Sequence, residues 1–198
     1  MDLKTVGVIG AGTMGRGIAC ASLIAGFRTV LEDVSPATLE RGVASVRKTL
    51  DEAVARGKVT LQERDRALEN LSTARLVEDA CRQADLLIEA LPEEMELQLE
   101  IFTIFDKFAK PGAILASTAS SLSINELAAI TFRTENCVGL RFCGPAPDTK
   151  LLEIIRAAET SDATVAACAE VGRRMGKEVV VLHESSGFSH GHIRAIQE

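Results

Sequence analysis

The chain has 198 residues, of which 46% are hydrophobic and 25% are charged, a size and composition typical of one globular domain. Its formal net charge of −6 argues against nucleic acid or an anionic membrane as a partner, because both are polyanions. No apolar run approaches the roughly 18 residues that a membrane span needs, and the N-terminus lacks the pattern of a signal peptide.

The cysteines favour a reducing compartment. They are odd in number and show no CxxC spacing, which is typical of free thiols and not of a disulfide framework or a zinc site. We therefore expect a cytoplasmic protein without a metal site, and we expect Cys20 and Cys168 to be packing residues inside helices. The five cysteines are Cys20, Cys81, Cys137, Cys143 and Cys168.

Short apolar runs alternate with longer periodic segments, the pattern of βαβ units and a mainly parallel sheet. The first half predicts strands at 5–9 and 27–31, a helix at 13–25, a long helix from Pro36 to Arg56, and a helix at 60–70. Ser35 is the expected N-cap of the long helix, and Thr60 with Glu63 forms a capping box. These two helices predict a helical hairpin at about 36–70, inserted into the α/β pattern.

The second half continues the alternation of strands and helices. It predicts strands at 85–89, 113–116, 137–140, 151–155 and 178–182, and helices at 93–110, 123–130 and 162–175. We therefore expect an α/β protein with a Rossmann-type, doubly wound, mainly parallel sheet over residues 1–186.

A glycine-rich loop follows the first strand. Gly10, Gly12 and Gly15 match the G-x-G-x-x-G spacing around Thr13 and Met14. Gly10 permits the tight turn, Gly12 lets the backbone approach a pyrophosphate, and Gly15 allows the helix to pack closely on the sheet. The helix N-terminus offers free N–H groups to the phosphates. The loop predicts a dinucleotide site.

An acidic residue at the end of the second strand completes this motif. Asp33 lies 18 positions after Gly15, where an acceptor for the adenosine ribose is expected. A carboxylate there repels a 2′-phosphate, so NAD is favoured over NADP. Glu32 is the neighbouring candidate, but strand alternation lets only one of the two face the ribose, and we favour Asp33.

Several further motifs, in a fixed order, resemble the N-terminal domain of the L-3-hydroxyacyl-CoA dehydrogenases from about residue 3 to residue 187. They are VIGAGTMG at 8–15, DVSP at 33–36, ADLLIEA at 84–90, PGAILAS at 111–117, SSL at 120–122, KLLE at 150–153 and S-x-GF at 185–188. The resemblance implies hydride transfer between NAD and a 3-hydroxyacyl-CoA in fatty-acid metabolism, with the inserted hairpin binding the acyl-CoA.

The resemblance also implies roles for single residues. Ala90 and Glu93 would line the nicotinamide-ribose side of the cofactor. Thr118, which stands where the family has an asparagine, would also be a cofactor-binding residue. Ser120 would bind the 3-oxygen of the substrate. Glu153 would orient and charge a catalytic histidine, the base that takes the hydroxyl proton.

That histidine is replaced by Arg141, which stays protonated and cannot accept a proton. Two family asparagines are likewise replaced, by Gly144 and Gly191. In one interpretation Arg141 forms a salt bridge with Glu153 and the site is catalytically poor. In the other, Arg141 clamps a substrate carboxylate or phosphate.

No other histidine is an obvious substitute. His183, His190 and His192 all lie late in the chain, and we interpret them as tail residues, although a loop shift could bring His190 to the site. His190 and His192 are too few ligands for a metal shell. Arg56 and Lys58 at the hairpin tip are candidates to meet CoA phosphates or are simply solvated.

The family continues into a helical, dimerising domain that this sequence lacks, so 187–198 is expected to begin a linker helix, and a homodimer is possible. Three functions stay open: a slowed or rerouted dehydrogenase, a non-catalytic NAD(H) sensor, and the cofactor half of a larger enzyme.

Overall fold

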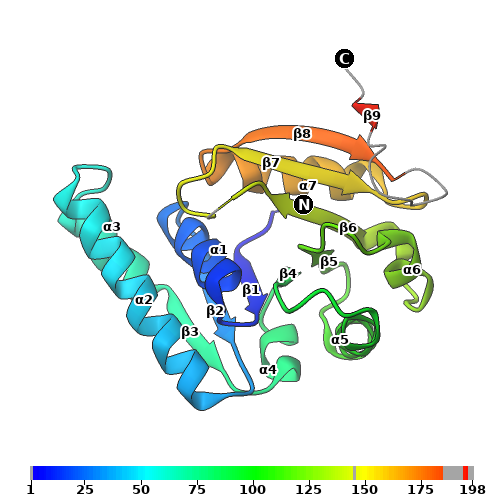
Figure 1. Ribbon diagram of the computed structural model, residues 1–198, viewed down its shortest axis with the longest axis horizontal. Coiled ribbons are helices and arrows are strands. Elements are labelled where there is room, and N and C mark those ends of the chain that lie inside the picture. Colours follow the sequence, from blue (N-terminus) through cyan, green and yellow to red (C-terminus); the bar gives the residue numbers. More distant parts are fainter. Residues whose placement is uncertain (1, 145, 185–193, 196–198) are drawn as a thin grey trace.

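A computed structural model describes residues 2–144, 146–184 and 194–195. Within them, nine strands form one sheet in the order β3-β2-β1-β4-β5-β6-β7-β8-β9 (Figure 1). The strands are β1 (Thr5–Ile9), β2 (Arg28–Glu32), β3 (Leu71–Ala74), β4 (Leu86–Glu89), β5 (Ile114–Ser117), β6 (Cys137–Phe142), β7 (Leu151–Arg156), β8 (Glu178–His183) and β9 (Arg194–Ala195). This strand order is that of a Rossmann-type sheet with added strands, which confirms the predicted fold class.

The sheet is parallel from β3 to β6. The strands at its centre are mostly apolar and fully buried, as expected where helices cover both faces. The β6–β7 pair is antiparallel, β7–β8 is parallel again, and β8–β9 is antiparallel. The sheet is therefore mainly parallel, as predicted.

Two apolar cores lie on the two faces of the sheet. The first contains side chains of α1, α2, α3 and α7, and the second contains side chains of α4, α5 and α6. The helices are α1 (Thr13–Ile24), α2 (Pro36–Ala55), α3 (Leu61–Glu69), α4 (Val77–Cys81), α5 (Met95–Phe108), α6 (Ile124–Ala129) and α7 (Asp162–Arg174), with a 3-10 turn η1 (Thr134–Asn136). Cys20 and Cys168 are buried in α1 and α7, which confirms them as packing residues.

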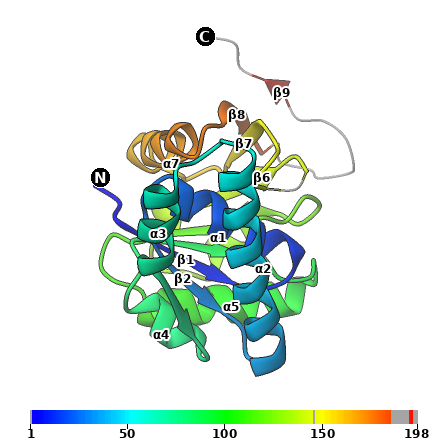
Figure 2. The same ribbon diagram turned by 90° about the vertical axis from the view of Figure 1, so that its left-hand side faces the viewer.

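The predicted helical hairpin is confirmed as α2 and α3, which lie side by side in front of α1 (Figure 2). The Ser35 hydroxyl accepts the N–H of Thr38 at 3.3 Å. At the start of α3, the Thr60 hydroxyl accepts the N–H of Glu63, and the Glu63 carboxylate accepts the N–H of Thr60. These caps satisfy helix N–H groups that would otherwise lack partners.

Three segments differ from the prediction. Strand β3 and helix α4 were not predicted, because β3 is an edge strand with exposed Ser72 and Thr73 and α4 has only five residues. Neither has enough apolar periodicity to be recognised. A linker helix was predicted to begin within 187–198, and this prediction is wrong at Arg194–Ala195. These two residues pair with β8 as strand β9, because the sheet satisfies their backbone groups. The rest of that segment lies outside the described residues.

Candidate functional site

The glycine loop joins β1 to α1 and depends on the lack of three side chains. Gly10 has a φ of 96°, a left-handed conformation that favours glycine. A Cβ on Gly15 would lie 1.7 Å from the carbonyl oxygen of Gly10, so only glycine lets the helix start so close to the strand. A Cβ on Gly12 would meet no atom within 4 Å. Space for a ligand therefore lies directly above Gly12.

The N-terminus of helix α1 lies beside this space. Gly12 is its N-cap and provides no side-chain cap, so the N–H groups of the first turn receive no oxygen from that side. Thr13 is exposed and Met14 is partly buried against the core. Free N–H groups and the positive end of the helix dipole suit a pyrophosphate. The loop thus fits the dinucleotide that its sequence predicts.

The two acids that end β2 have different surroundings. The Asp33 carboxylate is half-buried and accepts the N–H groups of Ala11 at 3.0 Å and Ser35 at 2.9 Å. It ties the glycine loop to the start of α2, and its oxygens retain lone pairs for a further donor. Glu32 is only 1% exposed. The structure therefore leaves Asp33, and not Glu32, accessible as the predicted ribose acceptor.

Glu32 is a buried acid with an unfilled hydrogen-bonding position. Its Oε1 is buried and has no partner among the described residues. Burial, together with the charges of Asp33 and Glu78, raises the pKa of Glu32 to about 7. Sequence reasoning considered Glu32 only as a ribose ligand and missed this effect, because burial depends on how distant segments pack.

A second buried acid, Glu89, lies at the end of β4 and was also missed. It is fully buried and accepts the hydroxyl of Ser117 at 2.7 Å and the N–H of Leu91. Burial raises the pKa of Glu89 despite these two hydrogen bonds. The N–H of Thr118 donates to the Glu89 carbonyl, and Ala90 follows Glu89 directly. Glu89 thus lies beside the predicted cofactor residues Ala90 and Thr118, and its side chain links the ends of β4 and β5.

Glu93 and Ser120, predicted for separate roles, are in direct contact. Glu93 Oε1 accepts the N–H and the hydroxyl of Ser120, both at 2.7 Å, and Oε2 accepts the N–H and hydroxyl of Ser121. Burial would raise the pKa of Glu93, but the hydrogen bonds from Ser121 and Ser120 outweigh it and lower that pKa. In this arrangement the Ser120 hydroxyl proton is directed at Glu93.

Arg141 and Glu153 face each other across the β6–β7 pair. Their backbones are in register, and the Arg141 Nη1 lies 3.1 Å from the Glu153 Oε2. Nη2 donates to the Ser120 carbonyl at 2.8 Å. The predicted salt bridge is confirmed. Arg141 therefore holds β6, β7 and the Ser120 turn together.

No histidine among the described residues stands at this position. His183 pairs with Arg156 at the C-terminal end of β7. Arg141 pairs with Glu153, and Gly139 with Ile155, so His183 lies farther along β7, away from Arg141. His190, His192 and Gly191 lie outside the described residues. Within the part that the structure describes, no three His, Cys, Asp or Glu side chains gather to bind a metal, and no helix there is both long and apolar enough to cross a bilayer.

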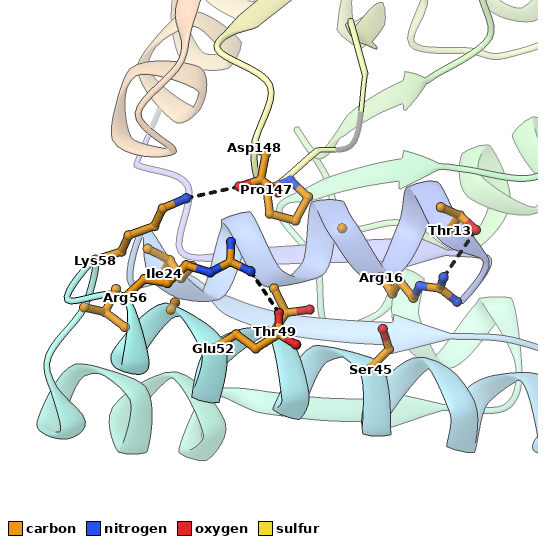
Figure 3. A pocket seen from close by; sticks show the side chains of 13 residues that line it. Thr13, Arg16, Ile24, Ser45, Thr49, Glu52, Arg56, Lys58, Pro147 and Asp148 are labelled. Atoms are coloured by element: carbon orange, nitrogen blue, oxygen red, sulfur yellow. Dashed lines mark hydrogen bonds and ion pairs between the residues drawn. The ribbon is translucent and has the colours of Figure 1, made fainter.

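A groove of about 390 Å³ lies between α1, α2 and the β6–β7 loop (Figure 3). Arg16 lies near Thr13 at one end of the groove, and Arg56 and Lys58 at the hairpin tip lie toward its other end (Figure 3). Arg56 contacts Glu52 at 3.5 Å, and Lys58 contacts Asp148 at 3.1 Å. Both candidate cations at the hairpin tip therefore line one groove, each beside a carboxylate.

Comparison with known proteins places the chain in a family. Residues 5–185 match the family described as 3-hydroxyacyl-CoA dehydrogenase, NAD binding domain. The chain belongs to this family, and its cofactor is NAD. The resemblance inferred from the motifs is confirmed.

The family relatives are similar over nearly the whole chain. A probable 3-hydroxybutyryl-CoA dehydrogenase of Bacillus subtilis is 37% identical over 95% of this chain and 65% of its own length. A 3-hydroxybutyryl-CoA dehydrogenase of Bradyrhizobium diazoefficiens is 40% identical over 94% and 63%. The crystal structure of 3-hydroxybutyryl-CoA dehydrogenase from Escherichia coli K12 superimposes with a TM-score of 0.89 at 34% identity, over 95% of this chain and 40% of that one. The chain thus spans slightly less than two thirds of the first two relatives.

The glycine loop predicts opposite effects for two alanine substitutions. Gly12→Ala adds a methyl group where the protein has no atom, so we expect an unchanged melting temperature and an NADH affinity weakened on the order of 10-fold. Gly15→Ala brings a methyl group onto the Gly10 carbonyl, so we expect a loss of stability of about 3 kcal/mol or more. Thermal melts and calorimetric titration with NADH measure both. Equal NADH affinity in Gly12→Ala and the original chain would contradict this placement of the pyrophosphate.

The raised pKa of Glu32 leads us to expect that the stability of the fold depends on pH. This pKa is about 7 in the folded chain and 4.5 in a model peptide, so the folded state holds the extra proton between these values. The free energy of unfolding then falls as the pH rises from about 4.5 to about 7. Glu32→Gln stays neutral, so at about pH 8 we expect it to be about 1–3 kcal/mol more stable than the original chain, with little difference at about pH 4. Urea unfolding at both pH values measures this. A difference that does not grow with pH would refute it.

Proposed function

We propose that the chain acts as an NAD(H)-dependent 3-hydroxyacyl-CoA dehydrogenase domain whose rate is limited because Arg141 occupies the position of the proton acceptor. Supporting the substrate class are the names of its relatives, which act on 3-hydroxybutyryl-CoA, and the groove lined by the hairpin. When bound, NAD supplies the hydride acceptor or donor. The observation that carries the proposal is the pairing of Arg141 with Glu153 at the end of β6.

The retained side chains can hold a substrate but leave its proton without an acceptor at Arg141. Ser120 lies just after β5, and its hydroxyl donates a hydrogen bond to Glu93. The carboxylate of Glu153, which the family uses to charge an imidazole, instead neutralises a guanidinium that never deprotonates. No side chain at position 141 can then accept the hydroxyl proton. Well-placed general bases contribute about 10²–10⁴-fold, so slow turnover is expected.

The groove is the proposed site of the coenzyme A part of the substrate. It runs from Thr13 in the glycine loop to Lys58 at the hairpin tip, so one end lies beside the cofactor loop and the other carries two cations. Arg56 and Lys58 would exchange their carboxylate partners for phosphates. These exposed ion pairs are weak and easily exchanged. A homodimer and a cytoplasmic location stay predictions.

A non-catalytic NAD(H) sensor is the second candidate. It is favoured by the internal hydrogen bonds of the site, because Arg141 and Ser120 both have protein partners without any ligand. A sensor would bind NADH and show no consumption of it with acetoacetyl-CoA. The two functions therefore differ in turnover and not in cofactor binding.

Restoring a base tests the proposal. With Arg141→His, Glu153 can charge and orient the imidazole, and we expect NADH oxidation by acetoacetyl-CoA to rise by about 10²–10⁴-fold. Absorbance of the reduced cofactor measures the rate. Arg141→Gln, which removes the charge without adding a base, is the matched control and should give no such rise. An equal rise in both variants, or none in either, would contradict the view that a missing base limits this site.

A further inference from the structure

The β6–β7 loop presents a carboxylate, Asp148, to the groove. Its oxygen lies 3.1 Å from the Lys58 ammonium, which reaches across from the hairpin tip (Figure 3). The two residues are 90 positions apart in the sequence, and their side chains are 64% and 57% exposed. The pair thus bridges the groove at the end near the hairpin tip, while both groups stay in contact with solvent.

The loop that carries Asp148 is firmly anchored. The buried Lys177 ammonium donates to the carbonyls of Ala146 at 2.6 Å and Thr149 at 2.7 Å, on either side of Asp148. Pro147 packs directly on α1, because a Cβ on Gly17 would lie only 3.0 Å from its Cδ. The position of Asp148 is therefore set by the core and not by its bond to Lys58.

The two partners differ in freedom. Lys58 is on the short turn between α2 and α3 and has a long flexible side chain. Asp148 is short and sits on the anchored loop. An anion entering the groove can therefore draw Lys58 away while Asp148 stays in place. An exposed ion pair costs little to break, so the exchange is reversible.

We propose that Asp148 is a specificity-determining residue of this groove: its carboxylate competes with the phosphates of an acyl-CoA for Lys58. This rests on the proposed function of the groove. A phosphate with two negative charges displaces a carboxylate from an ammonium, whereas a ligand with a single weak charge at that end does not. Asp148 thereby raises the negative charge that a ligand must carry at the Lys58 end of the groove in order to bind.

Calorimetric titration with coenzyme A tests this. Asp148→Asn removes the competitor, and we expect it to tighten CoA binding by about 2- to 5-fold, the range that an exposed ion pair represents. Lys58→Met should weaken binding by a similar factor. In the Lys58→Met background, Asp148→Asn should have no effect, because no ammonium remains to compete for. The gain should shrink in high salt, which screens exposed charges.

Two controls keep the outcomes separate. Asp79→Asn removes an exposed ion pair between α4 and Arg82, which directly follows it. It changes the net charge equally and should leave CoA affinity unchanged. NADH affinity, measured on every variant, reports an intact cofactor half. If Asp148→Asn leaves CoA affinity unchanged, or tightens it equally without Lys58, the competition is refuted while the groove stands. If NADH binds but no variant binds CoA, both this inference and the proposed function of the groove are overturned.

Discussion

A side chain at Gly15 would collide with the carbonyl oxygen of Gly10, and its lack lets α1 begin directly at the end of β1. The helix N-terminus then stands at the edge of the sheet where the parallel strands β2, β4 and β5 also end. Acids at those strand ends are brought to the same edge as the loop. The cofactor half of the site depends on this one close contact between helix and strand.

Five acids lie along this edge or beside it, and their surroundings differ. Glu32 and Glu89 are buried, and burial raises their pKa values. Asp33 is held by backbone N–H groups, and Glu93 by two serines. Glu153 is neutralised by Arg141. Because their surroundings differ in this way, only some of these carboxylates are free to receive a ligand.

The glycine loop and Asp33 match the family pattern that the resemblance implies, but some side chains around the site do not. Thr118 directly follows β5, whereas Arg141 and Gly144 lie on β6 and its loop. The cofactor side works largely through backbone groups and so depends on glycines and helix geometry. The β6–β7 side acts through side chains, which can change while the strands keep their register. Family membership and NAD binding are therefore compatible with altered chemistry at Arg141.

The sequence by itself determined the alternation of strands and helices, the glycine loop and the capping box, because those features depend on residues within a few positions of one another. The family pattern also indicated the Arg141–Glu153 pair. Only the tertiary structure decided that Glu93 holds Ser120 and that Lys58 meets Asp148, at separations of 27 and 90 positions. The burial of Glu32 likewise escaped prediction. Such contacts depend on how distant loops pack, and no local periodicity records that packing.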